Sequence, residues 1–231
     1  MPGSAVVVFL GPSLPRDRAE EILEADYRPP AKRGDLYQAA RQGARIICLI
    51  DGVFFQESSV AHKEVIYALE AGAKVLGASS MGALRASELD VYGMEGIGII
   101  YRAYKSGSLV SDDEVALTFD PFSYIPTSEP LVNIRFNLDL ACGKGIISEH
   151  SREKLFLAAR RLYFPHRTYQ SMLLEGSKDL PQAEMERLCG YMEGEKRDFK
   201  MEDALLALKR ARELAEQLSP DGVDLTIREA D

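Results

Sequence analysis

The chain has 231 residues, 46% of them hydrophobic, and a formal net charge of −8 at pH 7. This length suffices for one large domain, or for a domain with a smaller appendage. The acidic balance argues against a general binder of the nucleic-acid backbone. No apolar run approaches the ~20 residues that span a bilayer. The composition therefore excludes nucleic acid and membrane as expected partners.

Cysteine usage indicates the compartment. Cys48, Cys142 and Cys189 are far apart and odd in number, which fits a reduced cytoplasmic protein better than a disulfide framework. The N-terminus lacks a basic region before its short apolar run, so we expect no secretory signal. No spacing typical of a zinc site occurs. We therefore expect a cytoplasmic protein with no metal and no cofactor.

The first half of the chain alternates short apolar runs with helical patterns. Strands are predicted at 5–10, 45–50 and 74–76, and helices at 17–25, 35–42, 60–71 and 81–89. Ser58 or Ser59 is the expected cap of the third helix. Such alternation indicates parallel βαβ units, which bind ligands at the carboxyl edge of the sheet. We predict a doubly wound, mostly parallel α/β sheet over roughly residues 1–115.

The pattern changes after Tyr92. The sequence predicts a helix at 99–105, a strand at 115–119 and, from residue 131 onward, helices at 132–142, 148–163, 169–174 and 201–218. We accordingly divide the chain into an α/β core domain, a helical C-terminal region packed on that core, and a tail that frays. Their predicted bounds are 1–130, 131–220 and 221–231.

The most informative stretch is Gly77-Ala78-Ser79-Ser80-Met81-Gly82-Ala83-Leu84-Arg85-Ala86, between a predicted strand and a predicted helix. A serine on such a turn can act as a nucleophile, or the free N–H groups of the helix can bind an anion. Residues 78–82 depart from G-x-S-x-G by an alanine in the first position. The competing interpretation is that one serine only caps the helix.

Three polar residues meet at the same predicted edge. Asp51 follows one strand, Ser80 follows the next, and His62 lies in the first turn of the helix between them. A serine nucleophile needs a base, and the base needs an orienting carboxylate. We therefore predict Ser80 as nucleophile, His62 as base and Asp51 as orienting group, with the Met81 N–H stabilising the oxyanion.

Alternatives to this triad stay open. Ser79 can replace Ser80 as the nucleophile, or His62 can activate water directly. Asp51-Gly52 can be a simple turn, and His62 an ordinary core or surface histidine.

Further residues are candidates for binding substrate. Arg85 and Lys63 can bind a carboxylate, Gly11 can help to shape an anion site, and Ser79 and Met81 flank the expected nucleophile. The acidic run Asp112-Asp113-Glu114 can bind Mg²⁺, recognise a basic partner, or be simply solvated.

Several ordered blocks resemble the core pattern of TfuA-like proteins over roughly residues 5–135. They are Asp51-Gly52-Val53-Phe54, Val60-Ala61-His62-Lys63-Glu64, the stretch 77–86, Tyr92-Gly93-Met94, and Asp112-Asp113-Glu114-Val115-Ala116. The resemblance implies an accessory protein of YcaO enzymes, which use ATP to activate a peptide-backbone amide for thioamide formation. It implies recruitment of a ThiS-like sulfur carrier and hydrolysis of its C-terminal thiocarboxylate, which releases sulfide to YcaO.

The resemblance leaves a second class of function open. A TfuA-like protein can be a non-catalytic module that docks YcaO and the carrier and stimulates YcaO. A precursor peptide or protein substrate is a further implied partner. A third reading is an α/β protein that binds a nucleotide or phosphate.

Overall fold

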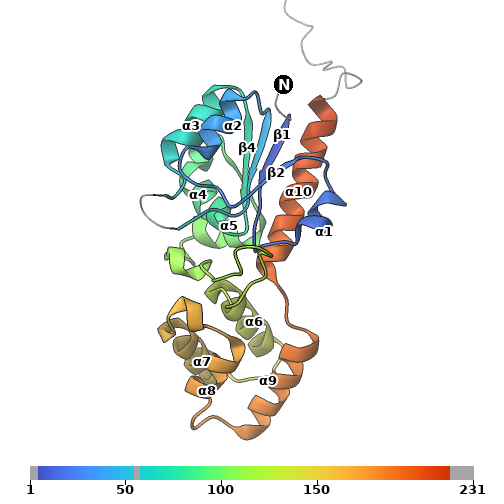
Figure 1. The fold of residues 1–231 in the computed structure, drawn as a ribbon. Helices are drawn as coiled ribbons and strands as arrows, with labels where there is room; N and C mark the ends of the chain where they lie inside the picture. The colour runs from blue at the N-terminus through green and yellow to red at the C-terminus, as the bar shows by residue number, and fades with distance from the viewer. Residues whose placement is uncertain (1–4, 55–57, 219–231) are drawn as a thin grey trace, which may run out of the picture.

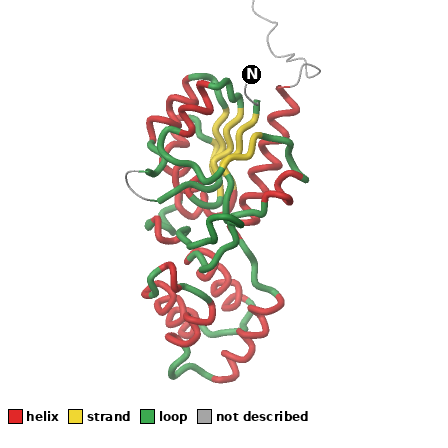
Figure 2. Tube along the Cα trace, in the orientation of Figure 1, coloured by secondary structure: helices red, strands yellow, loops and turns green. Residues whose placement is uncertain are grey.

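Five parallel strands form the sheet at the centre of the structure (Figures 1 and 2). A computed structural model describes residues 5–54 and 58–218, so the predicted tail 221–231 lies outside the described residues. The strand order is β2-β1-β3-β4-β5. The strands are β1 (Val6–Phe9), β2 (Asp26–Arg28), β3 (Ile46–Leu49), β4 (Lys74–Ala78) and β5 (Glu95–Ile97).

Helices cover both faces of the sheet, which confirms the predicted doubly wound α/β fold (Figure 1). The helices around the sheet are α1 (Arg16–Glu20), α2 (Asp35–Arg41), α3 (His62–Glu70), α4 (Met81–Leu89), α5 (Gly98–Lys105) and α10 (Phe199–Leu218). Buried residues of α1 and α10 pack on one face, and those of α2, α3 and α4 pack on the other. None of the described helices is both long and apolar enough to cross a bilayer.

The remaining helices form a separate layer beside the carboxyl ends of the strands (Figure 1). They are α6 (Leu131–Gly143), α7 (Glu149–Arg161), α8 (Tyr169–Gly176) and α9 (Gln182–Gly194). Leu138, Leu155 and Leu188 belong to their own apolar cluster. The long helix α10 then returns and buries Ala204, Leu208 and other side chains against the sheet. The predicted region 131–220 therefore contains a helix that shares the core of the sheet.

Some sequence-based expectations differ from the structure. The predicted strand at 115–119 is wrong: the segment is irregular, and only Phe119 forms an isolated antiparallel bridge, with Pro126. Val115 is instead buried among helical side chains, so its apolar character reflects packing rather than a strand. Ser58 and Ser59 do not cap α3, because Ala61 is the N-cap residue and its N–H donates to the Glu64 carboxylate.

Asp203 of α10 caps the N-terminus of α5. Its two carboxylate oxygens accept hydrogen bonds from the backbone N–H groups of Ile99 (2.9 Å) and Ile100 (2.8 Å). The carboxylate lies where a side chain on Gly98 would have to be, since a Cβ there would come within 2.0 Å of Asp203 Cγ. This contact joins α10 to α5 beside the sheet.

Asp203 should make stability depend on pH. Burial raises the pKa of this carboxyl from 3.8 to about 6, so between these values the folded chain binds more protons than the unfolded chain. Its contribution to the free energy of unfolding should therefore decrease as pH rises from about 4 to about 6. Over this range, the free energy of unfolding of the wild-type protein should fall by about 3 kcal/mol relative to that of Asp203→Asn. Urea denaturation measures both values. A difference that stays constant or grows would contradict this assignment.

Candidate functional site

The turn after β4 is strained. Ser79 has φ 65°, and the Ser80 N–H donates to the Ala78 carbonyl at 2.7 Å, which closes a γ-turn. Positive φ is uncommon for a non-glycine residue, and such outliers cluster at functional sites. The turn ends the strand abruptly and starts α4 at Met81.

Two glycines bring α4 directly onto the sheet. A Cβ on Gly82 would lie 1.8 Å from the Leu49 carbonyl oxygen, and one on Gly77 would lie 2.3 Å from the Gly82 carbonyl oxygen. The Gly82 N–H also donates to the Ile50 carbonyl at 3.2 Å. The glycines of the motif therefore place the N-terminus of α4 at the carboxyl edge of the sheet.

A cavity of about 490 Å³ lies at this edge. It is bordered by Pro12 after β1 and by Asp51 after β3, the two strands between which the chain order reverses. Ligands of open α/β sheets bind at such a switch point. The polar residues of the cavity include Ser80, Asp51 and Lys200, and its walls are largely apolar, with Phe54, Leu117, Phe119 and Phe164 among them.

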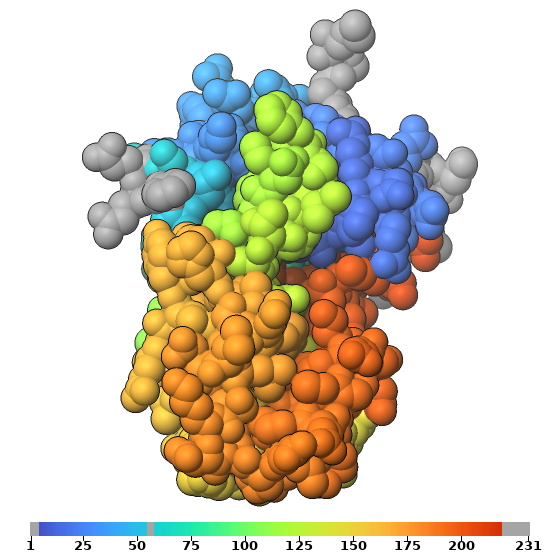
Figure 3. Space-filling view, turned by 60° about the horizontal axis from the view of Figure 1, so that its bottom comes forward, coloured from blue at the N-terminus to red at the C-terminus, as the bar shows by residue number. Residues whose placement is uncertain are grey.

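The loop around residue 120 lies across this edge. Thr127 N–H donates to the Thr118 carbonyl (2.8 Å), and Asp120 N–H donates to the Ile125 carbonyl (2.9 Å). Figure 3 shows this yellow-green segment between the blue N-terminal segments, above the orange helices of the C-terminal half. The loop thus forms part of the cover of the cavity.

Ser80 and Ser79 have different environments. Ser80 lines the cavity and is 2% exposed, and its Oγ forms neither a cap hydrogen bond nor any other with the described residues. The Met81 N–H likewise forms no hydrogen bond within the described chain. In contrast, Ser79 is fully buried and its Oγ donates to Ser13 Oγ at 2.9 Å. A free hydroxyl and a free N–H therefore lie together at Ser80 and Met81.

Asp51 holds the loop after β1. Its Oδ2 accepts from the N–H groups of Gly11 (2.9 Å) and Ser13 (3.0 Å), and its Oδ1 accepts from Ser13 Oγ (2.7 Å). Ser13 Oγ also accepts a hydrogen bond from Ser79 Oγ, so hydrogen bonds connect the loops after β1, β3 and β4. The Asp51 carboxylate therefore holds the backbone of Gly11 at the edge of the cavity.

His62 lies in a different group of residues. Its Nε2 is 2.8 Å from the Glu88 carboxylate, and its side chain is 53% exposed. Arg85 donates to the same carboxylate (2.7 Å) and to the Val60 carbonyl (2.9 Å), while Lys63 is exposed. None of the polar contacts of His62 in the described chain involves Asp51 or Ser80. The three residues of the predicted triad are therefore not joined by hydrogen bonds, because a carboxylate on α4 binds the imidazole.

Lys200 is a site residue that sequence reasoning missed. It is 2% exposed, lines the cavity with Ser80 and Asp51, and donates from Nζ to the Val115 carbonyl at 2.9 Å. Burial lowers the pKa of its ammonium group. Only the return of α10 to the sheet brings it here, and no local pattern around residue 200 signals this position.

The acidic run 112–114 is partly paired with the helical region. Glu114 forms an ion pair with Arg135, and Asp113 forms one with the buried Arg167 at 2.7 Å. The described residues contain no cluster of His, Cys, Asp and Glu suited to a metal ion. These carboxylates therefore connect the loop before residue 115 to α6 and to the segment after α7.

Comparison with known sequences matches residues 51–168, slightly more than half of the chain, to the family described as TfuA-like protein. The matched region includes Asp51, His62 and Ser80 but neither Ser13 nor Lys200. No curated protein is significantly similar to the chain.

Proposed function

Because the chain belongs to the TfuA-like protein family, we propose that it is an accessory protein of YcaO-dependent peptide-backbone thioamidation. In this proposal it hydrolyses the C-terminal thiocarboxylate of a ThiS-like sulfur carrier and supplies the released sulfide to YcaO. Family membership supports the accessory role in thioamidation, and the site supports the hydrolytic step.

The observation that carries the proposal is the free Ser80 hydroxyl in the cavity. It lies beside the free Met81 N–H at the start of α4, after a strained turn. Nucleophile and oxyanion donor have this arrangement where serine performs acyl transfer on an α/β sheet. Thiocarboxylate hydrolysis is a reaction of that class.

The reaction follows from these groups. Ser80 Oγ attacks the carbonyl carbon of the thiocarboxylated glycine, and the Met81 N–H stabilises the negative oxygen. The C–S bond then breaks, and the hydroxyl proton leaves on sulfur as hydrosulfide. Water hydrolyses the resulting ester, which regenerates Ser80 and leaves a carboxylate on the carrier.

The size and lining of the cavity fit an extended chain terminus. A volume of about 490 Å³ admits a small ligand or a few residues rather than a folded domain. The walls are largely apolar, with Phe54 and Phe119 among them, and such surroundings strengthen electrostatic interactions with the reacting group. The folded body of a carrier would then rest outside, against the loop around residue 120.

Exposed apolar side chains support the alternative of a docking module. Phe122 is 92% exposed and Ile125 is 64% exposed, and both lie on the loop that crosses the cavity edge. Exposed apolar groups are typical of protein-binding surfaces when they lie together. A non-catalytic module would use this surface to bind YcaO and the carrier without cleaving the thiocarboxylate.

One assay distinguishes hydrolysis from docking. We expect the purified protein, without YcaO or ATP, to release sulfide from a thiocarboxylated carrier and to leave the carboxylate form, detected by intact-mass spectrometry. The same carrier with an ordinary carboxylate terminus is the control and should remain unchanged. Stimulation of YcaO with no sulfide released by the protein alone would reject hydrolysis and favour docking.

A further inference from the structure

A second cavity, of about 400 Å³, lies beside the first cavity, which contains Ser80. Pro12 belongs to the walls of both cavities. The loop around residue 120 also borders both, because Phe119 lines the first cavity and Tyr124 lines the second. The centroids of these two aromatic rings are 5.7 Å apart. The two cavities are therefore neighbours, separated by side chains of two loops.

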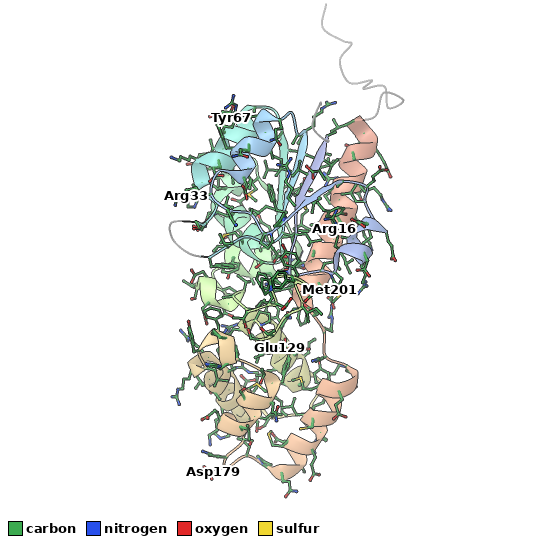
Figure 4. All side chains as sticks on the ribbon, in the orientation of Figure 1. Arg16, Arg33, Tyr67, Glu129, Asp179 and Met201 are labelled. Atoms are coloured by element: carbon green, nitrogen blue, oxygen red, sulfur yellow. The ribbon has the colours of Figure 1, made fainter. Side chains whose placement is uncertain are left out.

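The second cavity lies on the face of the sheet that α1 and α10 cover. Its lining includes Arg16, the first residue of α1, and Met201, in the first turn of α10. Figure 4 labels both residues. Leu14 and Tyr27 line the same cavity and belong to the apolar cluster of this face. The second cavity is therefore built on the hydrophobic core rather than on a mobile surface.

The walls of the second cavity are mainly apolar. Leu14, Tyr27 and Ile125 contribute side chains, and the Tyr27 hydroxyl donates to the Ala19 carbonyl at 2.8 Å within its own segment. The remaining apolar lining includes four prolines, at positions 12, 15, 29 and 126. Such walls suit an apolar side chain.

The charged residues of the second cavity already have partners. Arg16 forms an ion pair with Glu20 at 2.6 Å, and Arg28 forms one with Asp26 at 2.7 Å. Asp198 Oδ1 accepts two hydrogen bonds from the described chain. The lining therefore presents no unpartnered charge among the described residues, and it favours an uncharged group over an anion.

Backbone acceptors are available in the same lining. The carbonyl oxygens of Pro12, Pro29 and Pro126 accept no hydrogen bond from the described part of the chain. An extended polypeptide has a backbone N–H at nearly every residue, and each N–H needs an acceptor when it leaves water. Free carbonyl groups beside apolar walls are the features by which proteins bind extended peptides.

We propose that the second cavity binds the segment that precedes the C-terminal residue of the thiocarboxylated carrier, with one apolar side chain of that segment inside it. The proposal rests on the proposed function, which puts the terminal residue at Ser80 in the first cavity. An extended chain advances about 3.3 Å per residue, so the residues two to five from the end lie roughly 3 to 13 Å from the terminal one. The tail sequence then selects the carrier, in addition to the thiocarboxylate.

The first test measures sulfide release from synthetic peptides that lack a carrier body. The probes are acetylated heptapeptides of glycine and serine that end in a glycine thiocarboxylate, with a single leucine two, three, four or five residues from the end. At one of these positions, leucine should raise kcat/KM about 10-fold over the peptide without leucine, because its side chain leaves water. The other positions should have a smaller effect.

Matched variants locate the leucine effect. Ile125→Asp places a carboxylate at the wall of the second cavity and should reduce the 10-fold preference to about twofold or less. Ile125 is 64% exposed, so the fold should tolerate this change. Leu174→Asp alters a side chain of α8 that is 68% exposed and lines neither cavity, and it should keep the preference of wild type.

The second test needs no hydrolysis. The same peptides, with an ordinary carboxylate terminus and a diazirine analogue of leucine at each of the four positions, are irradiated with wild-type protein. Peptide mass spectrometry then identifies the crosslinked residues. For at least one position, we expect crosslinks to residues that line only the second cavity, such as Leu14, Tyr27 and Ile125.

Two results would overturn the proposal. One is the absence of crosslinks in the second cavity at every position, including the case where they occur only at Phe54 or Phe164 of the first cavity. The other is a leucine preference that folded Ile125→Asp retains in full.

The outcomes also distinguish this inference from the proposed function. Crosslinks in the second cavity without sulfide release keep the tail site and reject hydrolysis. Sulfide release at one rate from all the peptides, with crosslinks outside the second cavity, keeps hydrolysis and rejects the tail site.

Discussion

Replacing Ser80 by alanine is expected to lower sulfide release from a thiocarboxylated carrier by about 10³-fold or more, because the nucleophile and its base act as a unit. The fold should tolerate the change, since Ser80 Oγ makes no cap hydrogen bond. The free energy of unfolding should therefore stay within about 0.5 kcal/mol of wild type. Single-turnover sulfide release and urea denaturation measure the two quantities.

Two further variants make this result specific. Ser87→Ala removes another hydroxyl of α4, one that donates to the Leu84 carbonyl, and should keep the wild-type rate. Ser79→Ala tests the alternative nucleophile, whose hydroxyl is bound to Ser13. Near wild-type release by Ser80→Ala would end the covalent mechanism through Ser80. A loss of about 1 kcal/mol in its stability would instead indicate a capping role.

Gly82→Ala is expected to destabilise the protein by about 3 kcal/mol or more. In most helices, replacing glycine by alanine stabilises the helix by about 1 kcal/mol, so destabilisation here would be unusual. Here the added Cβ would lie 1.8 Å from the Leu49 carbonyl oxygen, and α4 would have to move away from the sheet. Chemical denaturation monitored by circular dichroism gives the change.

The matched control is Gly190→Ala in α9, where a Cβ would meet nothing within 4 Å. This exposed mid-helix substitution should be neutral or should stabilise the fold by up to about 1 kcal/mol. If Gly82→Ala were equally harmless, the close packing of α4 on β3 would be incorrect.

Local sequence determined the central part of the fold. The apolar runs at β1, β3 and β4 predicted buried strands, since strands covered on both faces need continuous apolar residues. The motif 77–86 predicted the turn and the start of α4 at Met81, because small residues and glycines allow a helix to begin against the sheet. Parallel topology then placed Asp51 and Ser80 at one edge, and both line the cavity.

Tertiary structure alone decided the features that depend on distant partners. The edge strands β2 and β5 have three residues each and no apolar run, so pairing with β1 and β4 defines them. The region 115–119 looked like a strand, but Val115 packs among helical side chains and Leu117 and Phe119 line the cavity. Apolar character alone does not distinguish such a segment from a strand.

The candidate site also depends on contacts between residues that are distant in sequence. His62 was assigned to the triad because it lies in the first turn of the helix between the two strands, yet Glu88, 26 residues away in sequence, binds its ring. Lys200 reaches the cavity only because α10 folds back across the helical layer and packs on the sheet. Periodicity tells which face of a helix is buried, but the neighbours of a polar side chain depend on contacts between segments far apart in the chain.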